Sequence, residues 1–474
     1  MDIPLYQQLA RHYLHAIRNG SLVQGSRMLS VRKLMQTHQV SLSTALQCCR
    51  HLEQQGWLVA RERSGFYISQ PVARQLAPAT EPDTQTGTAQ FVGIHEKVSQ
   101  IIAAGQRKVR VNLARATAAA ELYPHQALHK LALQQLRRDP TMLTRAITPT
   151  GRPELKTALA KRALDYGMSL VPEQLIITYG CMEALQLALR AVAQSGDVIA
   201  VETPTFYGLL QILESLGMRA LEIPTSPAQG MSLEALQLAL QHHPEIKAVV
   251  VVPHLQNPLG AMMPDAHKHA LLNLCNEHQL ALIEDDSYSG MVEGEIAPLA
   301  IKHWDKNGTV IYCASLHKVL APGMRVGWME AGRWHARVAM LKYAQTRYNE
   351  ELSQIVCADY LTTPAYTRHL RKLRNQLAHC RQQAANKIAD CFPADCRLSI
   401  PNGGASLWLE LPAGINSRLV FELALQRGIL ISPGLMYANS ARFDHCLRLN
   451  CSHPDSLEAL QEIAGIVRHL ADTV

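Results

Sequence analysis

The strongest constraint on the fold is an alternation, between residues 173 and 315, of short apolar stretches with amphipathic ones. The apolar stretches are strand-sized and rich in Val and Ile, whereas most of the others carry apolar residues at helical spacing. In chain order they read "EQLIITYG", "CMEALQLALRAVAQ", "DVIAVETP", "FYGLLQILESLG", "IKAVVVVP", "PDAHKHALLNLCNEHQ", "LALIEDD" and "GTVIYCAS". Parallel strands joined by covering helices produce this alternation. The predicted fold class is α/β, with a mostly parallel sheet and helices on both faces.

The pattern changes toward the end of the chain. "GGASLWLELP", "ILISPG" and "HCLRLNCS" are typical of strands, with one helix near 417–427 and a closing helix to 470. Strands and helices no longer alternate regularly there, which indicates a smaller α+β domain. A chain of 474 residues is in any case too long for one ordinary core.

The first 70 residues predict a different domain. "PLYQQLARHYLHAIRNGSL", "SVRKLMQTH" and "SLSTALQCCRHLEQQG" are helical, and Ser30 and Ser41 are expected to cap the second and third helices. "WLVARERSGFYIS" alternates about a Ser-Gly turn, as a β-hairpin does. Residues 1–75 hold nine Lys and Arg against three acids, which is +6 of the chain's net +7. A basic winged helix-turn-helix of this kind fits a polyanionic partner.

The domain boundaries follow from composition. "PVARQLAPATEPDTQTGTAQ" is rich in Pro, Ala, Thr and Gln and shows no periodicity, so it predicts a flexible linker. We therefore expect a winged helix over 1–70, a linker over 71–95, and a second domain over 96–474, with a large part at about 140–340 and a small part completed by about 345–474.

Several classes of protein are disfavoured. Arg11 and Arg18 interrupt the polar N-terminal stretch, which is unlike a signal peptide, and aliphatic runs such as "AVVVVP" are too short to span a membrane. The eleven cysteines lack a disulfide-framework spacing, so we expect reduced thiols and a cytoplasmic protein without membrane contact. No H-E-x-x-H or C-x-x-C spacing occurs, and no metal is predicted.

Three polar side chains cluster in "IYCASLHKVLAPGMRVGW", where Ser315 precedes Lys318 and Arg325 follows it. A lysine that forms a Schiff base needs a lowered pKa, and a hydroxyl together with an arginine can hold a phosphate dianion. Taken alone, Lys318 could equally be a solvated surface lysine. A reactive lysine beside a phosphate grip predicts a phosphorylated aldehyde, namely pyridoxal 5'-phosphate (PLP).

Other segments supply groups that PLP requires. Asp285, at the end of the strand in "IEDDSYSG", could keep the ring nitrogen protonated, and the Tyr288 phenol could reach the ring's 3-oxygen. By itself, Asp285 could also be a helix or turn cap. In "TYGCMEALQLALRAV", Gly180 separates a strand from a helix, so that the Cys181 and Met182 amides face an anion.

Two further segments complete the set. Phe206 and Tyr207 in "ETPTFYG" offer a flat partner for the ring, and Asn257 in "HLQNPLG" offers an amide for the ring oxygen, although Asn-Pro is usually a turn. The predicted catalytic residue is Lys318, and the predicted cofactor-binding residues are Gly180, Cys181, Met182, Phe206, Asn257, Asp285, Tyr288, Ser315, Lys318 and Arg325.

With these motifs, residues from about 110 to 470 resemble the fold-type I PLP-dependent enzymes, the aminotransferase class I/II family. The resemblance implies that Arg448 in "LRLNCS" binds a substrate or effector carboxylate; a strand-edge surface residue is the alternative. Three positions depart from the family, and one of them is Lys156, which stands in place of an arginine. Ala146 stands where a tyrosine usually bonds the phosphate of the neighbouring subunit's cofactor, and Phe206 stands where many relatives have tyrosine.

Residues 1–75 resemble a GntR-type winged helix, and its combination with an aminotransferase-like domain is similar to the MocR subgroup of GntR regulators. Leu29 and Leu42 depart from the proline and arginine common at those places. In such modules the second helix of the motif enters the major groove and the wing contacts the backbone or minor groove. The implied DNA contacts are Arg27, Ser30, Arg32, Ser41, Ser43, Thr44, Arg61 and Arg63.

The resemblance implies a homodimeric transcriptional regulator that binds double-stranded DNA and senses a small amine or amino acid by covalent exchange at Lys318. An active aminotransferase with an accessory DNA-binding domain stays open, because every group that transamination requires is present. A PLP-type fold used only for dimerisation is a third hypothesis. The sequence does not identify the effector, the operator or the sign of regulation.

Overall fold

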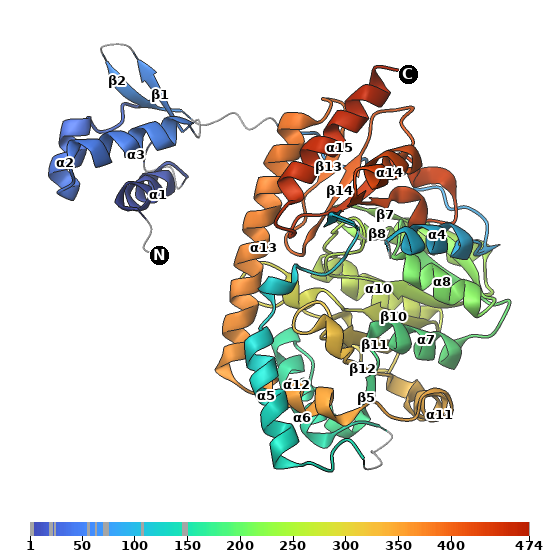
Figure 1. The fold of residues 1–474 in the computed structure, drawn as a ribbon. Coiled ribbons are helices and arrows are strands. Elements are labelled where there is room, and N and C mark those ends of the chain that lie inside the picture. Colours follow the sequence, from blue (N-terminus) through green and yellow to red (C-terminus); the bar gives the residue numbers. More distant parts are fainter. Residues whose placement is uncertain are drawn as a thin grey trace. The chain divides into compact units, whose positions relative to one another are not determined.

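The computed structural model describes residues 4–18, 22, 25–54, 57–61, 64–69, 75–105, 109–144 and 150–473. The chain forms two compact units, Met1–Gln75 and Leu76–Val474, which are described separately (Figure 1). Within the described residues, no helix has the length and apolar character needed to cross a bilayer.

The first unit is a winged helix-turn-helix, as predicted. Its elements are α1 (Leu5–Arg18), α2 (Val31–His38), α3 (Leu42–Gln54), β1 (Leu58–Arg61) and β2 (Gly65–Ile68). Ser30 Oγ accepts a hydrogen bond from the Lys33 amide at 3.2 Å, and Ser41 Oγ accepts one from the Thr44 amide at 3.2 Å. These bonds satisfy amides that would otherwise be unpaired at the helix starts, which is why α2 and α3 begin where they do.

The core of the first unit is built from the apolar positions that repeat along the three helices. Leu9, Tyr13 and Ile17 of α1 are buried at a spacing of four, which places them on one helical face. They pack against Leu34 of α2 and Leu52 of α3. The strands β1 and β2 pair antiparallel and form the wing.

The centre of the second unit is a large, mostly parallel sheet, as predicted. Within the described residues its order is β3-β7-β6-β9-β10-β11-β12-β5, with β8 paired to β7. The strands β12, β3 and β8 run antiparallel to their neighbours. The bounds are β3 (Gln90–Phe91), β5 (Leu175–Thr178), β6 (Val198–Thr203), β7 (Arg219–Ser226), β8 (Gly230–Met231), β9 (Ile246–Val251), β10 (Ala281–Asp285), β11 (Val310–Ser315) and β12 (Gly327–Glu330).

Helices lie on both faces of this sheet (Figure 1). Successive residues of one strand serve opposite faces: Leu282 packs in one core and Ile283 in another. A strand that is buried on both faces must be apolar throughout, which explains the continuous Val and Ile runs. The helices are α4 (His95–Gly105), α5 (His125–Arg138), α6 (Pro153–Ala163), α7 (Cys181–Val192), α8 (Tyr207–Ser215), α9 (Leu233–His242), α10 (Asp265–Glu277), α11 (His335–Gln345) and α12 (Glu351–Leu361).

The C-terminal part has the α+β character that the sequence indicates. Its four-stranded antiparallel sheet has the order β13-β14-β17-β16, and β15 pairs in parallel with β4. The elements are β4 (Val111–Asn112), α13 (Pro364–Cys391), β13 (Arg397–Ser399), β14 (Ser406–Glu410), α14 (Ser417–Gln426), β15 (Ile429–Leu430), β16 (Ser432–Pro433), β17 (Cys446–Asn450) and α15 (Ser456–Ala471).

The 28-residue helix α13 runs along the second unit (Figure 1). Near its start, Leu370, Leu373 and Leu377 pack in a core shared with α6 and α12. Near its end, Ala384 and Ile388 pack in the core beneath the small sheet. One helix therefore contributes to two cores.

The stretch predicted to be a flexible linker, residues 71–95, is hydrogen-bonded to the rest of the second unit at several points from residue 77 onward. The Leu398 amide donates to the Ala77 carbonyl at 2.9 Å, and Thr80 donates to the Glu410 carboxylate through its amide and its hydroxyl, at 2.8 and 2.7 Å. The strand β3, within the same stretch, pairs with β7. Ala79, Val92 and Ile94 of this stretch are buried, whereas Phe91 is exposed. Residues 71–74 lie outside the described residues.

Candidate functional site

A cavity of about 640 Å³ lies where the carboxyl ends of the parallel strands meet. Gly180 follows β5, Asp285 ends β10 and Ser315 ends β11, so the sheet brings residues distant in sequence to one edge. All ten predicted cofactor-binding residues line this cavity: Gly180, Cys181, Met182, Phe206, Asn257, Asp285, Tyr288, Ser315, Lys318 and Arg325. Their individual roles stay predictions, but their convergence is a property of the structure.

Lys318 is half-buried and faces the cavity. Its backbone carbonyl accepts a hydrogen bond from the Tyr123 hydroxyl at 3.1 Å, and its amine lies 5.4 Å from the centre of the Tyr288 ring. Burial of the amine, assisted by the positive charge of Arg448, lowers the pKa of Lys318 to about 7. A substantial fraction of the amine is thus unprotonated at neutral pH, as a nucleophile requires.

Asp285 is buried and fixed through one of its two oxygens. Oδ1 accepts hydrogen bonds from the Ser287 amide at 3.1 Å, the Ser287 hydroxyl at 2.6 Å and the Cys181 thiol at 3.1 Å. None of the described residues donates to the other oxygen, Oδ2. Burial raises the pKa of Asp285 above its ordinary value. A cationic N–H that approaches from the cavity would stabilise the ionised form of this carboxylate.

The start of α7 lines the same cavity as the lysine. Gly180 has a φ of 79° and directly precedes the helix, whose first residues, Cys181 and Met182, also line the cavity. The guanidinium of Arg325 donates to the Tyr179 carbonyl at 3.2 Å and stands 3.4 Å from where a Cβ of Gly180 would lie. Gly327 on β12 approaches closer still, since its Cβ would lie 2.5 Å from the Gly180 backbone. Because Gly180 and Gly327 have no side chains, the Arg325 guanidinium and β12 can both lie close to the backbone at Gly180.

Arg448, predicted to bind a carboxylate, is fully buried on β17 rather than at a strand edge. Its Nη1 donates to Asn257 Oδ1 at 3.1 Å, its Nη2 donates to the Ala114 carbonyl, and its Nε has no hydrogen-bond partner among the described residues. Asn257 Nδ2 in turn donates to the Tyr288 hydroxyl at 3.4 Å. The cation is therefore joined to the cavity through Asn257, and it keeps unused donors.

The ring of Phe206 lines the cavity and lies 5.0 Å, centre to centre, from that of Tyr207. The position of the missing tyrosine, Ala146, lies outside the described residues. Within the described part of the chain, no group of three or more His, Cys, Asp or Glu is placed to hold a metal ion.

Sequence reasoning missed several residues of the site. Ser287, two residues after Asp285, uses its amide and hydroxyl to fix the carboxylate, and the local Asp-x-Ser pattern is a signal that could have indicated this. The Cys181 thiol bonds Asp285 across 104 residues, and Tyr123 reaches Lys318 across 195, so no local signal identifies either contact. Arg115 lines both the large cavity and a neighbouring one of about 440 Å³.

The predicted DNA contacts all belong to the first unit. Arg27, Arg32, Ser43 and Arg61 are exposed, and Thr44 is half-buried. Ser30 and Ser41 are also exposed, but each hydroxyl caps a helix, as described above. Arg63 lies outside the described residues.

The exposed face of α3 extends beyond the predicted contacts. Gln47 and Arg50 are exposed and share a helical face with Ser43, at spacings of four and seven. They were missed, although this periodicity could have indicated them.

The wing carries its positive charge on a fixed side chain. The Arg61 guanidinium lies 4.2 Å from the centre of the Tyr67 ring, and the backbone of Arg27 bridges to Tyr67 from the other side. Arg61→Ala is expected to weaken binding to duplex DNA about equally for all sequences and to reduce the slope of log affinity against log salt by about one. Fluorescence anisotropy at several salt concentrations measures this slope. Arg11→Ala, at an exposed position of α1, is the control. An unchanged slope for Arg61→Ala would contradict the assignment of Arg61 as a DNA contact.

Comparison with known proteins agrees with both units. Residues 120–463 match the family "aminotransferase class I and II", and residues 5–68 match the "bacterial regulatory proteins, gntR family". The uncharacterized HTH-type transcriptional regulators YjiR and YdcR of Escherichia coli (strain K12) are 33% and 34% identical to the chain. The YjiR comparison covers 98% of both chains, and the YdcR comparison covers 94% of both.

Among solved structures, a kynurenine aminotransferase of Pyrococcus horikoshii superposes with a TM-score of 0.73 at 25% identity. The match covers 79% of this chain and 94% of that one. A fold-type I sheet with a lysine cavity, joined to a winged helix, defines a DNA-binding protein with an aminotransferase-like domain. The chain belongs to the GntR-type HTH regulators that carry a class I/II aminotransferase domain, the MocR subgroup.

This family implies PLP as the cofactor, and the cavity residues fit it. The aldehyde would find a partly unprotonated lysine, and the phosphate would find a glycine-led helix start beside Arg325. The ring nitrogen would find a carboxylate with one free oxygen. When bound, PLP supplies an electron sink for reactions at an amine carbon.

Proposed function

We propose that this protein is a transcriptional regulator whose second unit holds PLP on Lys318 and uses it to sense a small amine or amino acid. The observation that carries the proposal is the buried Lys318 amine, with its pKa lowered to about 7, facing Asp285 and Arg325 in one cavity. The GntR-type unit on the same chain supports DNA as the target of the response.

Each residue has a proposed role. Asp285 accepts from the ring nitrogen through Oδ2, and Tyr288 and Asn257 face the 3-oxygen. Phe206 packs on the ring. Ser315, Arg325 and the Cys181 and Met182 amides after Gly180 hold the phosphate. The proposed DNA contacts are Arg27, Ser30, Arg32, Ser41, Ser43, Thr44, Arg61 and Arg63.

An effector amine would compete with the Lys318 amine for the same aldehyde carbon. If the effector amine displaces it, the Lys318 amine would be released from PLP, and the cavity would gain the charge and volume of the effector. Such a change alters DNA binding only if the protein has two conformations that differ in their affinity for DNA and also in their affinity for the effector. The response therefore depends on two conformations that differ at this cavity.

The remaining proposals concern assembly and place of action. We propose a homodimer, because helix-turn-helix modules commonly read paired half-sites. We further propose that the protein acts in the cytoplasm, where bacterial DNA lies. The division of the second unit into a large part at about 140–340 and a small part to 474 is likewise a proposal.

The proposal is tested by loading the purified protein with PLP, reducing it with borohydride and mapping its peptides. A pyridoxyl group is expected on the peptide that contains Lys318. Its absence in the presence of excess PLP would contradict the proposal. Incubation with amino-acid and keto-acid panels then separates the alternatives. Multiple turnovers would identify an active aminotransferase, whereas a single, stalled exchange identifies a sensor. Failure to take up PLP would leave only a dimerisation role for the fold.

Arg448 provides a test of the effector class. Arg448→Lys keeps the charge but loses the planar fork that grips a carboxylate through two bonds. Charge-assisted hydrogen bonds contribute about 1.5–3 kcal/mol, so we expect amino-acid affinity to fall by roughly tenfold or more. Affinity for the corresponding amines, which lack the carboxylate, should not change. Spectrophotometric titration of the PLP-loaded protein measures both affinities.

The matched control is Arg418→Lys on exposed α14, which should alter neither affinity. Equal loss of amine and amino-acid affinity in Arg448→Lys would show that Arg448 acts only through the structure of the site.

A further inference from the structure

Three consecutive acids, Glu284, Asp285 and Asp286, are buried at the end of β10. They alternate between the two faces of the sheet: Asp285 lines the 640 Å³ cavity, and Asp286 lines a separate cavity of about 50 Å³. Glu284 accepts hydrogen bonds from the Ile301 and Lys302 amides at 2.8 and 2.9 Å. Burial raises the pKa of Glu284 to about 8, so this carboxyl keeps its proton at neutral pH. Asp285 and Asp286 repel each other when both are ionised and buried, so a nearby positive charge favours their ionised forms.

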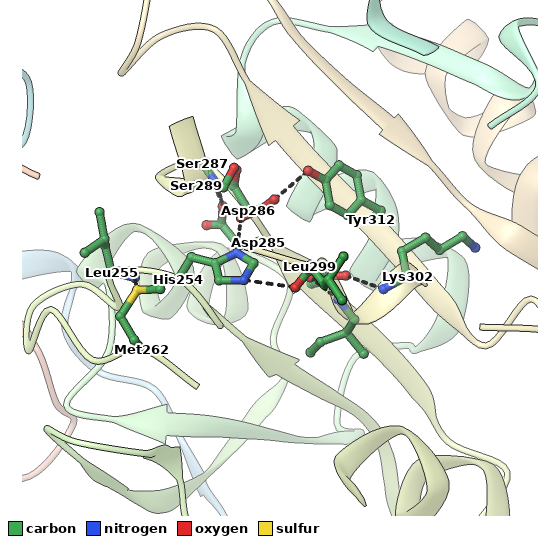
Figure 2. Close-up of polar contacts among 12 residues, drawn as sticks. His254, Leu255, Met262, Asp285, Asp286, Ser287, Ser289, Leu299, Lys302 and Tyr312 are labelled. Atoms are coloured by element: carbon green, nitrogen blue, oxygen red, sulfur yellow. Dashed lines mark hydrogen bonds and ion pairs between the residues drawn. The ribbon is translucent and has the colours of Figure 1, made fainter. Parts of the chain in front are cut away.

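His254 lies directly against Asp286. Both of its ring nitrogens lie within hydrogen-bonding distance of oxygen atoms, Nδ1 at 2.7 Å from Asp286 Oδ1 and Nε2 at 3.2 Å from the Leu299 carbonyl (Figure 2). A carbonyl oxygen only accepts, so Nε2 must carry a hydrogen. That carbonyl also accepts from the Lys268 amine at 2.8 Å. One further proton therefore lies between Nδ1 and Asp286.

The surroundings of Asp286 decide where that proton lies. The Tyr312 hydroxyl donates to Asp286 Oδ2 at 2.6 Å, which favours the charged carboxylate (Figure 2). Burial opposes the charge, yet the positive charge of His254 and the bonds from His254 and Tyr312 hold the pKa of Asp286 below its ordinary value. With Asp286 ionised, Nδ1 must donate as Nε2 does, and both ring nitrogens of His254 would carry a hydrogen.

Asp285 depends on this pair because it directly precedes Asp286. Burial raises the pKa of Asp285, and the negative charge of Asp286 raises it further. Without a positive His254, Asp286 would lie uncompensated directly beside Asp285, and protonation of one of the two carboxylates would become more favourable. Lys268 and Lys302 also lie near this cluster, but the Lys268 amine is paired with Asp265 at 3.1 Å and the Lys302 amine with Asp305 at 3.0 Å.

We propose that His254 is a buried imidazolium whose ion pair with Asp286 keeps Asp285 ionised for the ring nitrogen of PLP. This inference rests on the proposed function, because it takes Asp285 as the partner of that nitrogen. His254 is a positioning residue: it is not among the described residues that line either cavity, and it acts through Asp286.

The protonation state is tested directly on the native, PLP-free protein. Nuclear magnetic resonance of the protein labelled with 15N-histidine distinguishes a ring with two N–H groups from one with a bare nitrogen. We expect one histidine with both nitrogens protonated and hydrogen-bonded at neutral pH, and we expect its signals to vanish in His254→Gln. A His254 ring with one unprotonated nitrogen would overturn the proposal. This result comes from the native protein, so it does not depend on the folding of a variant.

The consequence for the cofactor is tested by equilibrium dialysis of PLP against three variants. His254→Gln is expected to weaken PLP binding by at least about tenfold, the scale of coupling between neighbouring buried charges. The double variant His254→Gln/Asp286→Asn should recover most of the affinity, because no charge is left to compensate. The control is His267→Gln. The native His267 ring is hydrogen-bonded to the Met231 carbonyl at 2.7 Å and not to any of the three acids, so this variant should leave PLP binding unchanged.

The outcomes separate the two claims. A double variant that binds PLP no better than His254→Gln would show that His254 acts by packing alone and would overturn the inference. Normal PLP binding by the native protein and by His254→Gln alike would also overturn it, while leaving the proposed function intact. A native protein that takes up no PLP would instead sink the proposed function.

Discussion

Lys318→Ala is expected to abolish both the covalent attachment of PLP and the transcriptional response to the effector. The alanine removes the cavity amine whose pKa burial lowers to about 7, and the described residues that line the cavity include no other lysine. PLP could still bind through its phosphate and ring nitrogen, but an effector amine would no longer have a lysine to displace. Borohydride reduction followed by peptide mapping measures attachment, and a reporter fused to a footprinted promoter measures the response.

Lys161→Ala provides the control for this experiment, since Lys161 is exposed on α6 and faces no cavity residue of the site. It should retain the adduct on Lys318 and a full effector response. A Lys318→Ala protein whose reporter still responds fully would rule out sensing by covalent exchange. An adduct that persists on another lysine would show that the reactive amine has been misidentified.

Asp285→Asn is expected to weaken PLP binding by roughly two orders of magnitude or more. The amide has nearly the shape of the carboxylate, so the bonds from Ser287 and Cys181 can largely persist, but the negative charge facing the ring nitrogen is lost. Breaking a buried ion pair by removing one partner costs about 3–5 kcal/mol. Equilibrium dialysis gives the affinity, and the absorbance spectrum of the bound cofactor reports the protonation of its ring.

Asp390→Asn makes the same chemical change at an exposed carboxylate on α13. It should leave the affinity and the spectrum unchanged. Native affinity in Asp285→Asn would mean that the ring nitrogen is not held by Asp285, and the site would have to be assigned again.

The fold and most of the site could be predicted because both depend on local patterns. Continuous Val and Ile runs indicate strands that are buried on both faces, and parallel strands bring their carboxyl ends to one edge. Asp285 and Ser315 end such strands, and Gly180 lies two residues after the end of β5, so their convergence follows from topology. The GntR-type unit is similarly encoded in short helices with serine caps at Ser30 and Ser41.

What the sequence did not reveal depends on contacts between distant segments. The segment over 75–95 has a composition typical of linkers, and only its partners, such as Glu410, show that it is ordered. The pairing of His254 with Asp286 joins residues 32 apart through the packing of β9 next to β10. Cys181 was expected to contribute only its backbone amide, yet its thiol also helps to fix Asp285.

The helix α13 has a consequence for how the second unit comes apart. Leu373 belongs to one hydrophobic core and Ile388 to another, yet both residues lie on the same continuous helix. Melting either core would free part of a helix that the other core needs for its own packing. The two cores are thus bound into one cooperative folding unit, and a partly denatured chain that keeps one of them intact has no simple way to form.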